Sequence, residues 1–230
     1  MEYLHNGFTL EICAGGFPLS TDSIALAGFV KLTKAAKVLD LGSGCGTLGT
    51  LLCAQNSFCN VTGIELDENA HKAALINIAR NDLASRLSSI CADVNAISEY
   101  IRPGSFQCCV SNPPYFQGGP DSKTLVARRN DTLSTEALFA AAGWALQYGG
   151  DFFLVHKPEM LGHLCAAGAK HNLEAKRLCL LRHSENGPVS LILLQLRKGG
   201  KPGLILEEAA LHKADGSPTN YYRKLYHLEG

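Results

Sequence analysis

Short apolar runs alternate with longer helix-like segments along most of this chain of 230 residues. Several of the short runs, such as Phe152–Val155 and Leu191–Leu194, are apolar at every position. Continuous apolarity of this length indicates strands that are buried on both faces of a sheet. We expect seven strands, over Lys37–Leu41, Val61–Glu65, Leu87–Cys91, Phe106–Ser111, Gly150–His156, Glu174–Arg182 and Val189–Arg197.

The segments between these strands carry helical patterns and capping residues. We expect helices that begin near Thr21 and Asp22 and near Gly49, and that span Glu68–Asp82, Leu133–Tyr148 and Met160–Lys170. Short polar side chains at a helix start accept hydrogen bonds from free backbone N–H groups, so Thr21 or Asp22 and Ser134 are expected N-caps. The helix from Leu133 is expected to present Ala137, Ala141, Trp144 and Tyr148 on one face.

Alternating strands and helices predict an α/β chain with a doubly wound, mostly parallel seven-stranded sheet. Only a turn over Ser184–Pro188 separates the last two strands, so an antiparallel hairpin should close one edge of the sheet. We expect a single domain over residues 1–230. Within it, 1–36 would form a lead-in and helix, 37–197 the core sheet and 198–230 a C-terminal extension.

Composition excludes several classes of protein. The 46% of hydrophobic residues suits a buried core, and no apolar stretch is long enough to cross a membrane. The first residues have neither a basic segment nor a following apolar run, so we expect no signal peptide. Nine cysteines without a Cys-x-x-Cys pair favour reduced thiols in a cytoplasmic protein over a metal site.

A glycine-rich loop follows the first strand, in the order Asp40-Leu-Gly42-Ser43-Gly44-Cys-Gly46. Alternate glycines let a backbone turn tightly and approach a ligand closely. Glu65 ends the next strand, where a carboxylate can accept hydrogen bonds from both hydroxyls of a ribose. We therefore expect a cofactor that contains adenosine, bound beyond the carboxyl ends of the strands.

Two interpretations of this loop compete. Gly44–Gly49 matches the G-x-G-x-x-G pattern of dinucleotide-binding proteins, which would favour NAD(P). The longer string Asp40–Gly46 resembles the first motif of class I S-adenosylmethionine-dependent methyltransferases. That resemblance implies S-adenosylmethionine, a Rossmann-like methyltransferase fold, cofactor contacts from Asp40 and the loop, and an acid after the third strand, where Asp93 stands. For Asp40 or Asp93 alone, a turn or helix-cap role is the competing interpretation.

Asn112-Pro113-Pro114-Tyr115 directly follows the fourth strand. The two prolines fix their φ angles, so the polar groups of this loop are held rigidly. The Asn112 side-chain oxygen and the Pro113 carbonyl are two acceptors that can bind both N–H groups of an exocyclic amine and direct its lone pair outward. Tyr115 offers a ring face on which an extruded base can stack.

Asn-Pro-Pro-Tyr resembles the fourth motif of the methyltransferases that act on amino groups. The chain as a whole resembles the family of bacterial tRNA (adenine-N6)-methyltransferases that act on valine tRNA, also through 17–27, 155–161 and 221–226. The resemblance implies methyl transfer to adenine N6 in the anticodon loop, with tRNA as a transient partner and neither a membrane nor a metal involved. It leaves the oligomeric state open.

Other functions remain as alternatives. Glutamine-N5 methylation of a protein, or methylation of another RNA base, would use the same chemistry. The roughly 36 residues before the first strand leave no room for the N-terminal helical domain of the glutamine enzymes. An NAD(P)-dependent oxidoreductase would leave the Asn-Pro-Pro-Tyr motif unexplained. A non-catalytic RNA-binding scaffold is disfavoured because all the chemical positions are filled.

The zero net charge conceals an asymmetry along the chain. Residues 1–115 carry 7 basic and 10 acidic side chains, and residues 116–230 carry 14 and 11, so the halves are −3 and +3. We expect some of the later cations to contact RNA phosphates beside the site, with Lys123, Arg128 and Arg129 as the candidates. The competing interpretation is that Arg128 and Arg129 are an exposed pair with no ligand.

Overall fold

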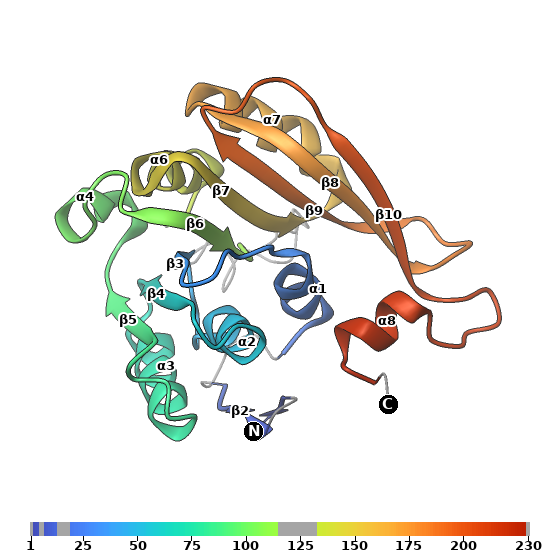
Figure 1. Ribbon diagram of the computed structural model, residues 1–230, viewed down its shortest axis with the longest axis horizontal. Helices are drawn as coiled ribbons and strands as arrows, with labels where there is room; N and C mark the ends of the chain where they lie inside the picture. The colour runs from blue at the N-terminus through green and yellow to red at the C-terminus, as the bar shows by residue number, and fades with distance from the viewer. Residues whose placement is uncertain (1, 5–6, 13–18, 115–132, 229–230) are drawn as a thin grey trace, which may run out of the picture.

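The computed structural model describes residues 2–4, 7–12, 19–114 and 133–228, and its centre is an eight-stranded sheet (Figure 1). The strand order across the sheet is β10-β8-β9-β7-β6-β3-β4-β5. The strands are β3 (Lys37–Leu41), β4 (Asn60–Glu65), β5 (Leu87–Cys91), β6 (Phe106–Ser111), β7 (Leu146–His156), β8 (Leu173–Ser184), β9 (Val189–Lys198) and β10 (Ile205–His212). Strands β3, β4, β5, β6 and β7 run parallel to one another, and β9 is antiparallel to both β7 and β8.

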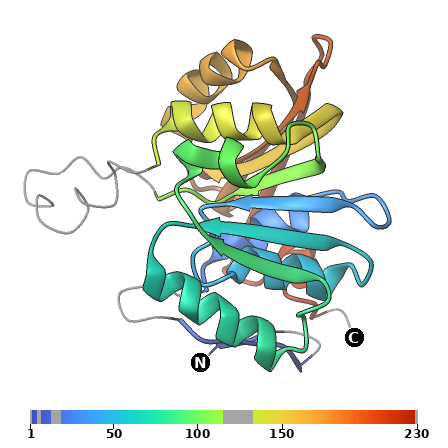
Figure 2. The same cartoon turned by 90° about the vertical axis from the view of Figure 1, so that its left-hand side faces the viewer.

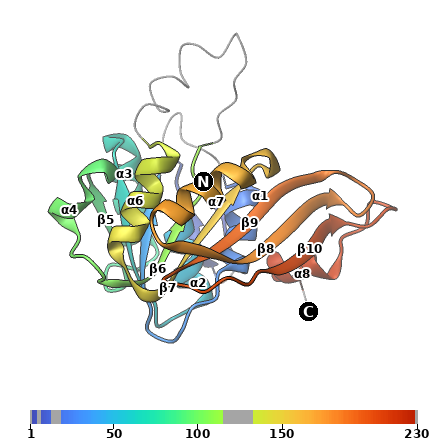
Figure 3. The same cartoon turned by 90° about the horizontal axis from the view of Figure 1, so that it is seen from above.

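Helices cover both faces of the sheet (Figure 1). One face carries α1 (Thr21–Phe29), α2 (Thr47–Gln55), α3 (Glu68–Arg80) and the C-terminal α8 (Asn220–Leu225). The other face carries α4 (Ile97–Tyr100), α6 (Thr135–Ala145) and α7 (Leu161–Lys170), and Figure 3 shows α6 and α7 side by side over the strands. Short 3-10 turns precede α4 at Val94–Ala96 and α7 at Pro158–Met160. This is the doubly wound arrangement that the alternating pattern predicts.

The fully apolar strands serve both cores, as their sequence predicts. Phe153 and Val155 of β7 lie in the core under α1 and α2, and their neighbours Phe152 and Leu154 lie in the core under α6 and α7. The adjacent cysteines of β6 divide in the same way, because successive side chains of a strand point to opposite faces. A central strand of this sheet therefore has no polar face.

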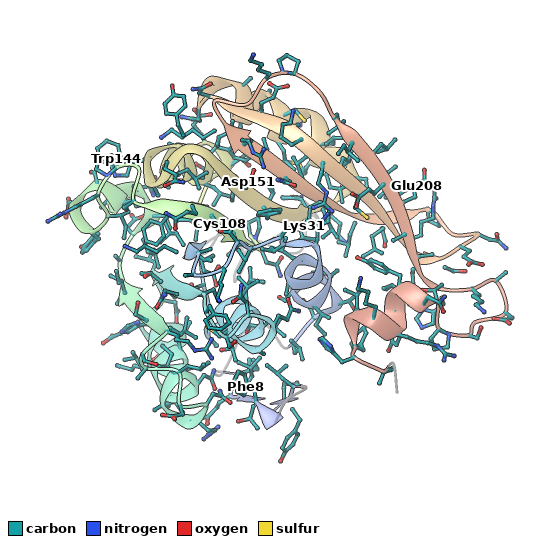
Figure 4. The ribbon with its side chains drawn as sticks, in the orientation of Figure 1. Phe8, Lys31, Cys108, Trp144, Asp151 and Glu208 are labelled. Atoms are coloured by element: carbon teal, nitrogen blue, oxygen red, sulfur yellow. The ribbon has the colours of Figure 1, made fainter. Side chains whose placement is uncertain are left out.

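All seven expected strands are present, and β10 adds an eighth that the sequence analysis does not anticipate. It extends the sheet beyond residue 197 and runs parallel to β8, so the β8–β9 hairpin does not form the edge. Arg177 of β8 fixes the added strand through two bonds to the Glu207 carboxylate, at 3.0 and 3.1 Å. Its guanidinium also lies 4.2 Å from the ring centre of Phe29. A further cross-strand pair joins Arg197 of β9 to Asp151 of β7, and Asp151 is labelled in Figure 4.

Two helix expectations are wrong in detail. The N-cap of α1 is Ser20, not Thr21 or Asp22, and its hydroxyl accepts from the Ser23 N–H at 3.4 Å. Helix α6 has the expected Ser134 cap but ends at Ala145, because the following residues join β7. Trp144 is consequently half exposed at the outer end of α6 and Tyr148 is exposed, so neither belongs to a buried helix face (Figure 4).

The N-terminal segment is attached to α3 by Asn77 within the helix and by Asn81, which directly follows it. Strand β2 (Thr9–Leu10) pairs with β1 (Glu2–Tyr3) and lies against the helix. The buried Asn77 accepts from the Glu11 N–H and donates to the Glu11 carbonyl, at 2.7 and 2.9 Å. Asn81, one turn later, binds the N–H and carbonyl of Thr9 in the same way. Asn77 alone of these two also donates to the Cys45 carbonyl, at 2.9 Å.

No helix within the described ranges has the length and apolarity that a membrane crossing requires. The eight cysteines that the structure describes are all free thiols.

We expect Asn77→Ala to lower the free energy of unfolding by about 2–4 kcal/mol, because it removes three hydrogen bonds to the backbone of Glu11 and Cys45. Urea denaturation measures this loss. Asn81→Ala is the matched control and should cost less, about 1 kcal/mol, because Asn81 is only half buried. An equal or smaller loss for Asn77→Ala would contradict the importance of its contact with Cys45.

Candidate active site

Four neighbouring parallel strands bring the expected site residues to one edge of the sheet. The loops after β3, β4, β5 and β6 leave the sheet on the same side, because these strands run in the same direction (Figure 2). In the register of β3, Asp40 is opposite Gly63 of β4 and Val110 of β6. The glycine loop therefore lies between the segment that ends in Glu65 and the segment that continues into Asn112.

The three alternate glycines of the loop are required by its backbone. Gly42, Gly44 and Gly46 have φ angles of +73°, +56° and +77°, in the region that favours glycine. The N–H groups of Gly42 and Ser43 both donate to the Ile64 carbonyl, at 3.0 Å. A Cβ on Gly42 would also lie 2.9 Å from the Leu133 side chain. The loop therefore closes onto β4 in one defined conformation.

Glu65 supports this loop from the end of β4. One carboxylate oxygen accepts from the Gly44 N–H at 2.8 Å, and the other accepts from the Asp67 N–H at 2.8 Å. A Cβ added to Gly44 would meet no atom within 4 Å. The loop is therefore open at Gly44, and the Glu65 carboxylate is fixed in orientation beside that opening.

Asp40 is a buried carboxyl beneath the first turn of α2. Burial raises its pKa from 3.8 to about 7, and the nearby Glu65 charge adds to the rise. The Gly49 N–H at the start of α2 donates to this carboxyl and offsets part of the effect. Asp40 therefore titrates near neutral pH in the protein.

Two oxygens of this region are buried without a hydrogen-bond partner among the described residues. They are Oδ2 of Asp40 and Oγ of Ser43. Buried polar atoms in native proteins nearly always have a partner, so an orphaned pair indicates a place where a ligand or water binds. The absence of a side chain at Gly63 leaves room for Ser43, because a Cβ on residue 63 would lie only 2.6 Å from the Ser43 Oγ.

Asp93 stands after β5, as expected, and it also caps the short helix that follows. Its Oδ1 accepts from the backbone N–H of Asn95 at 2.8 Å and from the Asn95 side chain at 2.9 Å. Asp93 therefore caps the helix, as the competing interpretation of this residue predicted. It fixes the carboxylate at the carboxyl end of β5, the strand beside β4.

Asn112 lies beside the start of the glycine loop. Ser111, which precedes it, donates its hydroxyl to the Leu41 carbonyl at 2.8 Å, and this bond joins β6 to the last residue of β3. The Asn112 side-chain nitrogen donates to Ser23 Oγ of α1 at 3.0 Å. Pro113 is buried and Pro114 is half buried, so the described part of the motif is packed into the domain. Tyr115, Lys123, Arg128 and Arg129 lie outside the described residues.

Three residues of this region are absent from the expected set. Ser23 contacts Asn112, Ser111 joins the two central strands, and Asn77 holds the Cys45 carbonyl within the glycine loop. Ser23 lies within 17–27, a segment that carries the family resemblance, but the sequence pattern there points to Thr21 and Asp22 instead. In the sequence, Asn77 cannot be told apart from any other polar residue of a helix. Only its burial in the folded structure identifies it as important.

The carboxylates at this edge of the sheet fit the cofactor that the resemblance implies. S-adenosylmethionine carries an ammonium group, a ribose with two hydroxyls, and adenine. The edge of the sheet offers the orphaned Asp40 oxygen, the fixed Glu65 carboxylate and Asp93, in that order across three adjacent strands. The open backbone at Gly44 leaves space beside them. Within the described ranges, no three His, Cys, Asp or Glu side chains come together as a metal site would require.

Sequence comparison gives one family match and a set of relatives that share a name. The model of the methyltransferase small domain family matches residues 21–166. The tRNA1(Val) (adenine(37)-N6)-methyltransferase of Shewanella halifaxensis is 35% identical over 182 residues, which cover 78% of this chain and 72% of the relative. The protein of the same name from Photobacterium profundum is 32% identical over 187 residues, which cover 79% and 78%. The one from Bacteroides fragilis is 28% identical over 214 residues, which cover 90% of each.

Two solved structures with similar folds are named as methyltransferases. A predicted O-methyltransferase from Agrobacterium tumefaciens superposes with a TM-score of 0.76 at 20% identity, covering 90% of this chain and 96% of the other. A geranyl diphosphate C-methyltransferase from Streptomyces coelicolor, in complex with S-adenosyl-L-homocysteine, gives a TM-score of 0.54 at 11% identity, covering 76% and 78%. At these identities the likeness shows the fold alone.

We expect Asp40→Asn to change how stability depends on pH. The folded-state pKa of Asp40 is about 7, above the unfolded value of 3.8, so the native protein retains a proton that the unfolded chain has lost between these values. The contribution of Asp40 to stability is therefore complete below about pH 4 and falls as the pH rises to about 7, by at most about 4 kcal/mol.

Urea unfolding of both proteins between pH 4 and pH 8 measures this effect. Relative to the wild type, Asp40→Asn should become more stable as the pH rises through this range and should level off above pH 7. A difference in unfolding free energy that stays constant from pH 4 to pH 8 would contradict the raised pKa.

Proposed function

Because this chain belongs to the methyltransferase small domain family, we propose that it transfers a methyl group from S-adenosylmethionine to N6 of an adenine in tRNA. The relatives that cover most of the chain are named for adenine 37 of a valine tRNA, and we propose the same target here. We also propose that the enzyme acts in the cytoplasm, which the eight free thiols support.

The observation that carries this proposal is the position of Asn112 beside the glycine loop. The motif after β6 and the loop after β3 leave two adjacent parallel strands, which the Ser111–Leu41 hydrogen bond joins at their ends. A cofactor on the loop and a base at the motif would consequently meet at one point. An NAD(P)-dependent oxidoreductase would need the loop but would have no use for Asn112.

We assign the cofactor contacts by the chemistry of the three acids and the loop. Asp40 would hold the ammonium group, Glu65 the ribose hydroxyls and Asp93 the adenine, while Gly42, Ser43, Gly44 and Gly46 would line the methionine and ribose. When bound, S-adenosylmethionine supplies a methyl group that is already electrophilic, because it is attached to a positively charged sulfur. The chain therefore has to provide positioning rather than a strong base.

The role of Asn112 and Pro113 is to prepare the target amine. The N6 nitrogen of adenine is a poor nucleophile, because its lone pair is delocalised into the ring. The Asn112 Oδ1 and the Pro113 carbonyl accept hydrogen bonds from its two N–H groups. This favours a pyramidal nitrogen with its lone pair directed at the methyl group. The bound cofactor would supply the methyl group and keep the bonding pair on its sulfur, and the extra proton on the methylated nitrogen would leave to solvent.

Pro113 and Pro114 contribute stiffness to this arrangement. Each fixes its own φ angle, so the two acceptors keep their separation while the base enters. The base has to leave its stack to reach Asn112, which costs a few kcal/mol and less in a loop than in a duplex. Tyr115 would recover part of that cost by stacking on the extruded ring.

We expect Asn112→Ala to abolish methyl transfer while leaving cofactor affinity within about twofold, because the variant loses an acceptor of the target amine and no cofactor contact. Incorporation of labelled methyl groups into tRNA measures transfer, and calorimetry with S-adenosylhomocysteine measures affinity. Asn69→Ala, on the exposed side of α3, is the matched control and should behave as the wild type. Methylation by Asn112→Ala at the wild-type rate would contradict the mechanism.

The same assay separates the substrate classes. Parallel reactions with total tRNA and with protein extract, followed by nucleoside mass spectrometry, should yield N6-methyladenosine from tRNA only. Label confined to protein would instead support glutamine methylation, and a different methylated nucleoside would identify another base.

We expect replacement of Lys123, Arg128 and Arg129 by Gln to weaken tRNA binding and to reduce its dependence on salt, because fewer phosphates would be contacted. Titration of tRNA binding between about 50 and 200 mM salt measures both quantities. The matched control replaces Lys31, Lys34 and Lys37, which precede or begin β3 and so lie toward the opposite edge of the sheet. Equal losses in the two triple variants would contradict the assignment of the later cations to RNA.

A further inference from the structure

We propose that Ser23 is a positioning residue for methyl transfer, which holds the carboxamide of Asn112 in the orientation that presents Oδ1 to the target amine. This inference rests on the proposed function. It adds to that function a residue from the first helix, far from the Asn-Pro-Pro-Tyr motif in sequence.

The contact itself is a part-buried hydrogen bond between α1 and the segment that follows β6. The Asn112 Nδ2 donates to Ser23 Oγ at 3.0 Å, and Ser23 has only 7% of its surface exposed. A terminal carboxamide rotates in a broad, roughly two-fold well, so rotamer preference alone does not decide which side its oxygen occupies. With Nδ2 directed at α1, the planar geometry of the group turns Oδ1 away from that helix.

The first turn of α1 is a firm support for this bond. Ser20 caps the helix, and its hydroxyl accepts from the Ser23 N–H at 3.4 Å. Thr21 Oγ1 lies 3.3 Å from the Tyr226 hydroxyl just after α8, so the same turn is also held from the C-terminal segment. At the other end of α1, the ring of Phe29 packs edge-on against Phe153 of β7, with ring centres 6.0 Å apart.

A purely structural role for Ser23 makes different predictions from a positioning role. A structural hydroxyl would affect stability and cofactor affinity together, whereas a positioning hydroxyl would affect the rate of the chemical step. Ser20 provides the comparison, because it stabilises the same helical turn and has no contact with Asn112 among those that the structure describes.

The experiment compares Ser23→Ala with Ser20→Ala in the full-length protein. For Ser23→Ala we expect kcat for tRNA methylation to fall about 10- to 100-fold, because a misplaced acceptor loses the aligned geometry. Its affinity for S-adenosylhomocysteine should stay within about twofold of the wild type, and its melting temperature should fall no further than that of Ser20→Ala. Ser20→Ala should keep a kcat within about threefold of the wild type.

One further measurement ties the effect to Asn112. In cofactor-free protein, the side-chain amide protons of Asn112 should exchange with solvent more slowly in the wild type than in Ser23→Ala. NMR with 15N labelling follows this exchange without any methylation.

The outcomes separate this inference from the proposed function. A wild-type kcat for Ser23→Ala, or an equal loss for Ser20→Ala, overturns the positioning role while Asn112 keeps its own. Absence of tRNA methylation by the wild-type protein instead overturns the proposed function. In that case unchanged amide exchange in Ser23→Ala would overturn the contact as well.

Discussion

The pairing of β3 with β4 on one side and β6 on the other is the contact on which the candidate site depends. The glycine loop and the Asn-Pro-Pro-Tyr motif, which are about 70 residues apart in sequence, become neighbours because their strands are adjacent and parallel. The two bonds from the loop to the Ile64 carbonyl and the bond from Ser111 to Leu41 fix this arrangement at the strand ends. The remaining strands and both helix layers bury this central unit and keep its register.

The candidate site is built mainly from backbone constraints. Left-handed glycines shape the loop, Gly63 leaves room for Ser43, and two prolines hold the turn after Asn112. Such constraints suit a reaction whose electrophile comes with the cofactor, because placing two reactants is then the main task of the protein. Asp40 is the exception, since its burial moves its titration close to neutral pH. A carboxyl in that state is sensitive to any cation that binds beside it.

The sequence predicted those features best that depend on residues close together along the chain. Apolarity on both faces located seven strands, and glycine or proline spacing located both loops, because these properties act over a few residues. Elements that depend on distant partners were missed. Strand β10 depends on its pairing with β8 and on the Arg177–Glu207 contact. The end of α6 is set by the start of β7, and the burial of Asn77 comes from a segment that precedes it by more than 60 residues. Ser23 belongs to the same class, because only the folded chain brings it to Asn112.

The bridge through Asn77 has a consequence for how the N-terminal segment and the cofactor loop influence each other. One carboxamide binds the backbone of Glu11 and the carbonyl of Cys45, so ordering of either partner favours the conformation in which Asn77 holds both. Coupling between binding events is reciprocal in free energy. A ligand that orders the glycine loop would therefore also favour the attachment of β2, and loss of that attachment would weaken binding of the ligand. The attachment of β2 to the protein would therefore report on the conformation of the glycine loop.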